Sequence, residues 1–273
     1  MKQRTLTALC GIPLLIAFVW FDTPWFPLLI FVVAGVVILG IREFYQLASK
    51  AGGHPLTVFG TICALAFVVV ALFGFSFDWV ILLVSMLVPM IWLYFRSNRE
   101  HAVTNWAWTL IGIVYVGWLM SHYVAIRNLE PVEEGRGWVF IALFSTFACD
   151  TSAYLIGRSW GKHLMAPSIS PAKTWEGAAA GLIGAIVAVV VINAIMLAVN
   201  TDISLSLVHA IILGCLIGVV AQIGDLLESS IKRKAGAKDA GSILPGHGGL
   251  LDRIDSIMFT GVVVYYYVMV VIG

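Results

Sequence analysis

Long apolar runs dominate this chain of 273 residues and limit what it can fold into. A helix that crosses a bilayer needs about 17–25 apolar residues, and nine runs of the sequence have roughly that length. The runs are too long for membrane β-strands and lack their alternation, so helices must satisfy the backbone groups in lipid. We therefore expect an all-α, polytopic integral membrane protein. The expected spans are residues 5–21, 24–41, 56–76, 79–95, 106–126, 138–157, 176–198, 204–225 and 256–272.

The basic residues predict which side of the membrane each loop faces. With the N-terminus in the cytoplasm, fourteen of the 16 lysines and arginines fall on the cytoplasmic side, and Arg127 and Arg136 are the two outside. Cytoplasmic loops of membrane proteins carry such an excess of lysine and arginine. We therefore expect a cytoplasmic N-terminus, with the polar stretch before the last span on the same side, where nucleotides are found.

The motifs divide the chain into two expected regions. Residues 1–137 form an N-terminal membrane region of about five spans with few motifs, in which Arg42 and Glu43 mark a span end. An ion pair between these two is the expectation, and a lipid contact is the alternative. The C-terminal catalytic membrane region has about four spans and takes up the rest of the chain. Its boundaries are 138–273, with cytoplasmic loops at 158–176 and 226–255.

Charged residues make up only 11% of the chain, yet they gather in residues 222–256. This stretch contains Asp225, Asp239, Asp252 and Asp255 among several basic residues. Carboxylate oxygens suit Mg²⁺, which binds one or two protein carboxylates together with substrate phosphates. The pattern therefore favours a site for a metal ion and a polyphosphate. The basic side chains that can neutralise the phosphates are Lys232, Arg233, Lys234 and Lys238.

Two local features support this interpretation of the stretch. If the eighth span continues as a helix past Asp225, then Gln222, Asp225, Ser229 and Lys232 lie roughly on one face. Further on, a proline stiffens the entry to a glycine-rich loop, whose backbone N–H groups can approach an anion closely. That loop consists of Pro245, Gly246, His247, Gly248 and Gly249.

Simpler explanations fit parts of the stretch. A basic run beside a span, such as 232–234, is often a topology signal or a patch for lipid headgroups. A pair of glycines is usually a turn. Neither explanation accounts for four aspartates among the lysines, since acidic residues add little to membrane orientation. The combination favours the metal and polyphosphate site.

A second informative stretch covers residues 150–177. Asp150 lies inside the sixth expected span, and an aspartate in a membrane marks a functional site or a buried pair. Lys173 precedes the seventh helix, where free N–H groups already attract anions. It is a candidate phosphate contact, and an ordinary lysine of the cytoplasmic side is the alternative.

Both stretches resemble the phosphatidate cytidylyltransferase family, whose members are also called CDP-diacylglycerol synthases. Every fixed position of the two patterns is present with its spacing intact. The resemblance covers roughly residues 138–273 with specific motifs, and residues 1–137 only by hydropathy and number of spans. The matching residues are Asp150, Ala153, Tyr154, Ser170, Pro171, Lys173, Thr174, Glu176, Gly177, Lys232, Arg233, Lys238, Asp239 and the run 245–255.

The resemblance implies a transferase for phospholipid biosynthesis. It would move a cytidylyl group from CTP to phosphatidic acid, giving CDP-diacylglycerol and pyrophosphate, in a reaction that depends on Mg²⁺. The implied partners are these two substrates, the bilayer and a second copy of the chain in a homodimer, with no nucleic acid. A short chain without a targeting extension suits a bacterial inner membrane, with the active site facing the cytoplasm.

The resemblance also implies roles for the motif residues. It points to Asp225 and Asp252 as the pair that holds Mg²⁺, with Asp239 and Asp255 as further ligands or as partners of nearby cations. A second cation such as K⁺ is left open. The implied catalytic residues are Lys173, Asp225, Lys232, Arg233, Lys238, Asp239, His247, Asp252, Arg253 and Asp255. The implied substrate-binding residues are Asp150, Tyr154, Ser170, Lys173, Thr174, Gly246, Gly248 and Gly249.

Two other functions stay open on the sequence. A CTP-dependent membrane lipid kinase would share the spans and the metal site, but it would transfer the γ-phosphoryl group to an alcohol and release CDP. An ion-coupled transporter would use Asp150 and Asp225 as coupling carboxylates, and it predicts inverted repeats. No internal repeat is evident in the sequence.

Overall fold

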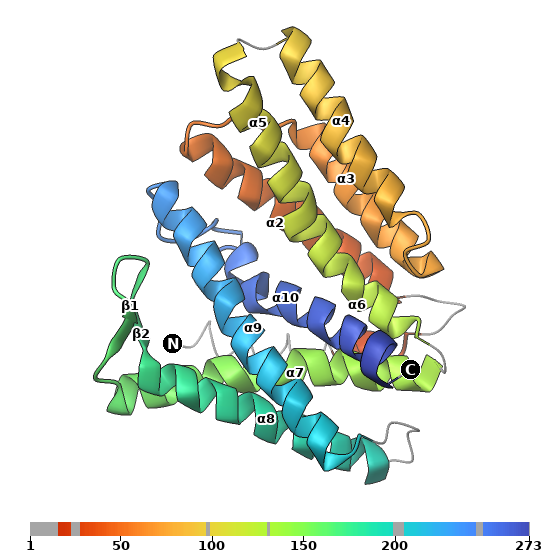
Figure 1. Ribbon diagram of the computed structural model, residues 1–273, viewed down its shortest axis with the longest axis vertical. Helices are drawn as coiled ribbons and strands as arrows, with labels where there is room; N and C mark the ends of the chain where they lie inside the picture. Colours follow the sequence, from red (N-terminus) through yellow and green to blue (C-terminus); the bar gives the residue numbers. More distant parts are fainter. Residues whose placement is uncertain are drawn as a thin grey trace. The chain divides into compact units, whose positions relative to one another are not determined.

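The computed structural model describes residues 16–22, 28–96, 99–129, 132–198, 205–243 and 248–272. Helices make up nearly all of this part of the chain, and one two-stranded hairpin interrupts them (Figure 1). Element η1 is a 3-10 turn, whereas η2 and η3 are π-helical. The elements are α2 (Leu28–Lys50), α3 (Thr57–Val70), η1 (Ala71–Phe73), α4 (Asp78–Arg96), α5 (Arg99–Gly112), η2 (Ile113–Trp118), α6 (Leu119–Arg127), α7 (Val132–Trp160), β1 (Leu164–Ala166), β2 (Ser170–Thr174), α8 (Trp175–Ala198), α9 (Leu207–Lys234), α10 (Leu251–Tyr267) and η3 (Val268–Ile272).

Seven helical segments of the described chain are long and apolar enough to cross a membrane. One of them, His101–Arg127, combines α5, η2 and α6, whereas Thr57–Phe73 is apolar but shorter. Eight of the nine expected spans coincide with helices, and the first, 5–21, lies mostly outside the described residues. The expected all-α membrane fold is confirmed. The total number of spans and the side of the N-terminus stay predictions.

Two helices continue beyond the apolar runs that predicted them. Helix α2 reaches Lys50, and α9 reaches Lys234, well past Asp225. Polar side chains on one face leave the backbone hydrogen bonds of a helix intact, so a helix need not end with its apolar run. Residues 235–250 are therefore all that lies between α9 and α10, fewer than the 226–255 expected for this loop.

The chain forms two compact units. The first consists of residues 1–125 and 231–253, and the second of residues 126–230 and 254–273. These boundaries fall inside α9 and α10, so the last turn of α9 and the first turn of α10 belong to the first unit. The expected division into an N-terminal and a catalytic region stays a prediction.

In the first unit, an aromatic cluster holds α2 against α5 and η2. The ring of Phe44 lies 5.8 Å from that of Trp108 and 5.5 Å from that of Tyr115, measured between centroids. The hydroxyl of Tyr45 donates a hydrogen bond of 2.9 Å to the carbonyl of Thr109, which satisfies a group that would be costly to bury unpaired. The two ring contacts of Phe44 set the rotation of α2 and so decide which of its residues face inward.

In the second unit, α7 and α8 pack closely through small residues (Figure 1). Gly181 of α8 lies against Cys149 and Ala153 of α7, and a Cβ atom at Gly184 would collide with Ser152. Small residues let helix backbones approach in a membrane, where tight packing drives helix association. Strands β1 and β2 connect the two helices as an antiparallel hairpin, so the close pair also determines where this hairpin lies.

Candidate active site

Lys173 lies on β2, in a hairpin whose base is held by Glu176. Glu176, in the first turn of α8, accepts hydrogen bonds from the backbone N–H groups of Lys162 and His163 at 3.1 and 3.2 Å. It accepts a third from His163 Nδ1 at 2.6 Å. These contacts join the start of the hairpin to the helix that follows it. The position of Lys173 is therefore defined by both neighbouring elements.

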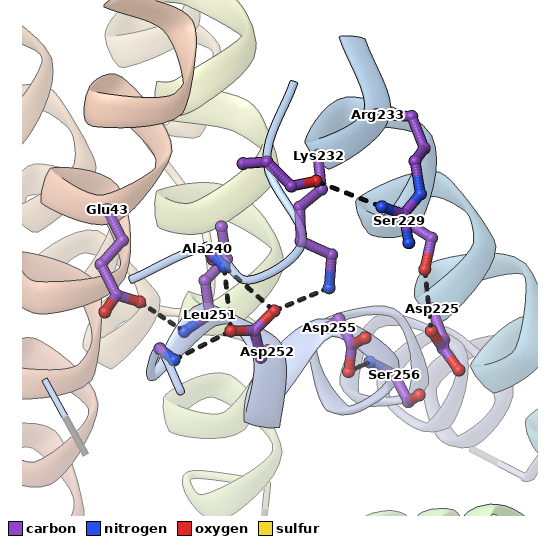
Figure 2. Close-up of polar contacts among 12 residues, drawn as sticks. Glu43, Asp225, Ser229, Lys232, Arg233, Ala240, Leu251, Asp252, Asp255 and Ser256 are labelled. Carbon is purple, nitrogen blue, oxygen red and sulfur yellow. Dashed lines mark hydrogen bonds and ion pairs between the residues drawn. The ribbon is translucent and has the colours of Figure 1, made fainter. Parts of the chain in front are cut away.

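An ion pair joins the two motif stretches within the second unit. Lys173 Nζ lies 2.7 Å from Asp225 Oδ2 on α9. The hydroxyl of Ser229 donates to the other oxygen of Asp225 at 3.4 Å (Figure 2), as the predicted shared helix face requires. Gln222 holds this part of α9 against α8, because its Nε2 donates to the carbonyl of Ala178 at 3.1 Å. The paired side chains of Lys173 and Asp225 stay 21% and 35% exposed.

Further carboxylates surround Asp225. Asp255 on α10 is 8% exposed. Its carboxylate interacts electrostatically with those of Asp225, Glu228 and Asp150. Ser256 donates a hydrogen bond of 2.8 Å to Asp255 through its backbone N–H, and one of 3.4 Å to Asp150 through its hydroxyl. Positive charge near these carboxylates offsets their mutual repulsion. Lys173, which pairs with Asp225, also interacts electrostatically with Asp150.

In the first unit, Asp252 organises the segment between α9 and α10 (Figure 2). One carboxylate oxygen accepts a hydrogen bond from Lys232 Nζ at 2.6 Å. The other accepts the N–H groups of Ala240 and Gly249 at 2.9 and 2.8 Å. The side chains of Lys232 and Asp252 are only 11% and 8% exposed. Because each oxygen already has a donor, the carboxylate is an internal anchor for this segment.

The other basic candidates at the end of α9 differ in their surroundings. Arg233 is exposed and donates a long hydrogen bond of 3.4 Å to the carbonyl of Ala237. Lys234 Nζ lies 5.4 Å from the ring centroid of Trp108. This is a cation–π contact within the first unit, so the charge of Lys234 already has a partner. Arg233 is therefore better placed than Lys234 to meet an anion from solvent. Also exposed on this part of the chain are Lys238, Asp239 and Arg253.

The glycine-rich loop is described only in part. Gly246 and His247 lie outside the described residues. Gly248 has a φ of +84°, a left-handed conformation that favours glycine. Gly249 donates its N–H to Asp252, so this donor points into the protein rather than toward a ligand. The expected anion contacts of the loop stay predictions.

Two of the expected substrate-binding residues of the second unit, Tyr154 and Thr174, have local hydrogen-bond partners. The hydroxyl of Tyr154 accepts a hydrogen bond from Arg158 Nη1 at 2.8 Å, and the side chain stays exposed. Thr174 Oγ1 accepts the N–H of Gly177 at 3.2 Å and caps the start of α8. Ser170 begins β2. Thr174 and Ser170 thus shape the hairpin, whereas Tyr154 is accessible.

Two buried glutamates are missing from the expected site residues. Glu228 is 0% exposed, and its spacing of three from Asp225 on a helix was the signal that could have found it. Glu43 is also 0% exposed and accepts the N–H of Leu251 at 2.8 Å. The structure thereby replaces the expected partner of Glu43: Arg42 is exposed, and these two described residues form no ion pair. No local pattern signals the contact with Leu251.

The described residues show whether the site suits Mg²⁺. No group of three or more His, Cys, Asp or Glu among them is arranged to hold a metal ion by itself. Mg²⁺ needs only one or two protein carboxylates, because water and substrate phosphates complete its ligands. Asp225, with hard oxygen atoms and 35% of its side chain exposed, fits such a site. Asp252 would first have to exchange its internal donors.

Apolar spans, with a pair of lysine and aspartate in each unit, indicate an integral membrane protein suited to phosphate chemistry. The sequence matches the Cytidylyltransferase family over residues 2–271, and the chain belongs to this family. It is 36% identical over 266 residues to phosphatidate cytidylyltransferase 5, chloroplastic, of Arabidopsis thaliana, across 86% of this chain and 64% of that protein. It is 32% identical over 264 residues to the phosphatidate cytidylyltransferase of Staphylococcus haemolyticus, across 95% of each. The chain thus spans less than two thirds of the plant relative and nearly all of the bacterial one.

Proposed function

We propose that the protein transfers a cytidylyl group from CTP to phosphatidic acid, giving CDP-diacylglycerol and pyrophosphate. Relatives named phosphatidate cytidylyltransferase match it over most of its length. The observation that carries the proposal is the ion pair of 2.7 Å between Lys173 and Asp225. It brings together the stretches 150–177 and 222–256, so that a cation suited to phosphate lies beside a carboxylate suited to a metal ion.

The reaction is an in-line displacement at phosphorus. An ionised phosphate oxygen of phosphatidic acid attacks the α-phosphorus of CTP and forms a new P–O bond. The bond from that phosphorus to the bridging oxygen breaks, and pyrophosphate leaves with the electron pair. The attacking oxygen carries no proton at neutral pH, so no general base is needed. The protein must instead hold two anions together and compensate their charge.

The cations of the site are proposed to bind the phosphates. Lys173 is partly exposed, so it can exchange Asp225 for a phosphate without leaving a buried charge unpaired. Arg233 is exposed and can bind a phosphate with two parallel hydrogen bonds. Mg²⁺, when bound, supplies charge neutralisation for the triphosphate. Asp225 and Asp252 are its proposed ligands, as the resemblance implies, with Asp255 as a further one.

We also propose that the active site faces the cytoplasm of a bacterial inner membrane. The expected placement of fourteen of the 16 basic residues on one side supports the orientation. The similarity to bacterial proteins supports the assignment to a bacterial membrane. A homodimer and a second cation such as K⁺ are proposed on the family resemblance alone. The cytoplasmic side is also where CTP is available.

The function is tested with purified protein in detergent, given phosphatidic acid, Mg²⁺ and CTP labelled with ³²P at the α-phosphorus. We expect label in the lipid phase, matched by released pyrophosphate. Asp225→Asn should lower the rate by about 100-fold or more, whereas Val58→Ala, at an exposed position of α3, should not change it. Lipid labelled only from γ-labelled CTP, with a lipid alcohol in place of phosphatidic acid, would indicate a lipid kinase. No labelled lipid with any divalent ion would refute the proposal.

A further inference from the structure

Glu43 is a buried carboxylate that the proposed reaction does not use. It lies on α2, 208 residues before its hydrogen-bond partner Leu251 in the sequence. Its side chain is 0% exposed. Burying an ionised carboxylate is costly unless the protein supplies compensating partners. Those partners therefore indicate what the residue does.

The partners of Glu43 belong to the segment that leads into α10 (Figure 2). Oε2 accepts the N–H of Leu251, the first residue of α10, at 2.8 Å. Such N–H groups have no partner within their own helix, and the positive end of the helix dipole favours a carboxylate there. Two glycines also lie directly against the carboxylate. A Cβ atom at Gly241 would collide with Oε1, and one at Gly249 would come within 2.8 Å of Oε2.

Asp252 holds the same segment at neighbouring positions. Gly249 donates its N–H to Asp252, and Leu251, two residues later, donates to Glu43. At the other end, Ala240 donates to Asp252 at 2.9 Å, and the next residue packs on Glu43. Along the segment, residues that donate to Asp252 therefore lie one or two positions from residues that contact Glu43. Loss of Asp252 frees the N–H groups of Ala240 and Gly249, and loss of Glu43 frees that of Leu251.

The aromatic cluster of the first unit supports the start of this segment. Lys234, the last residue of α9, stacks on Trp108 with 5.4 Å between Nζ and the ring centroid. Trp108 in turn contacts Phe44, the residue next to Glu43. Helix α2 thus contributes to both ends of the segment: its aromatic neighbours support the end of α9, and Glu43 holds the beginning of α10.

We propose that Glu43 is a positioning residue for cytidylyl transfer. It holds the entry to α10, and thereby the placement of Asp252 and of the glycines before it, without touching substrate. The catalytic part of this inference rests on the proposed function. The structural part does not, because the firmness of the segment can be measured in the absence of any reaction.

Trypsin cleavage after Lys238, which is exposed on the segment, measures how firmly the segment is held. Glu43→Ala removes the carboxylate and Gly241→Ala displaces it with a methyl group, so each should speed cleavage about tenfold or more. Glu43→Gln keeps an oxygen acceptor for Leu251 and should stay within about threefold of the wild type. Tyr45→Phe is the matched control, because it removes a hydrogen bond from α2 without touching the segment.

The same variants have a catalytic readout. Glu43→Ala and Gly241→Ala should lower kcat about tenfold or more, with KM for CTP within about threefold, and Glu43→Gln should restore most of the rate. Tyr45→Phe should keep kcat while lowering the unfolding temperature. If Glu43→Ala does not fold, Gly241→Ala and Glu43→Gln carry the same comparison.

Three results would overturn the inference. Cleavage as slow in Gly241→Ala and Glu43→Ala as in the wild type would show that the carboxylate does not hold the segment. Equal acceleration by Tyr45→Phe would show general loosening of α2. Faster cleavage with unchanged kcat would show that the segment does not matter for the reaction. A wild type without cytidylyl transfer would instead refute the proposed function. The cleavage rates would still test whether Glu43 holds the segment.

Discussion

The ion pair between Lys173 and Asp225 makes a quantitative prediction. At the observed 2.7 Å, two unit charges attract by about 1.5 kcal/mol in a medium as polar as water and by about 6 kcal/mol at an effective dielectric constant near 20. The side chains are 21% and 35% exposed, so water screens most of the larger value, and ordering them costs conformational entropy. We expect a coupling of about 1 kcal/mol in the free energy of unfolding.

A double-mutant cycle measures this coupling. Lys173→Met, Asp225→Asn and the double variant are unfolded by heat in detergent, and unfolding is followed by a thiol-reactive dye that reaches the buried Cys63 and Cys149. The double variant should be more stable than the sum of the single changes predicts, by about 1 kcal/mol or about 2–4 °C in unfolding temperature.

The cycle has a matched control and a clear negative result. Lys238 is exposed, so Lys238→Met combined with Asp225→Asn should show no coupling. If Lys173→Met and Asp225→Asn are likewise additive within about 0.3–0.5 kcal/mol, the two side chains do not interact. The observation that carries the proposed function would then be lost.

Three further perturbations test other parts of the structure. Asp252→Asn breaks the buried ion pair with Lys232 and should lower the free energy of unfolding by about 3–5 kcal/mol; an unchanged unfolding temperature would contradict the anchor role. Glu176→Gln should speed amide hydrogen exchange in the hairpin at 162–174 while the unfolding temperature stays the same. Unchanged exchange there would show that Glu176 does not hold the hairpin. Gly181→Leu should cost about 1–3 kcal/mol or prevent folding, because a Cβ atom there would already lie 3.1 Å from α7, and size-exclusion chromatography of the detergent-solubilised protein reports the loss.

The sequence by itself determined the helical spans and the chemistry of the motifs. Helix α8 spans Trp175–Ala198, almost as the apolar run 176–198 predicts, because the length and polarity of a span are local properties. The continuation of α9 past Asp225 was likewise open to prediction from helical spacing. Recognition of the family also needed only residue types and spacings, and the match over 2–271 confirms it.

The tertiary structure alone decided which of these residues meet. Spacing places residues on a face of a helix, but it does not say which face packs against which other element. The rotation of α2, set by the aromatic contacts of Phe44, directs Glu43 to Leu251. Close packing of α7 and α8 sets where their hairpin carries its lysine. Partners so far apart in sequence depend on the packing of a whole unit, which no local pattern records.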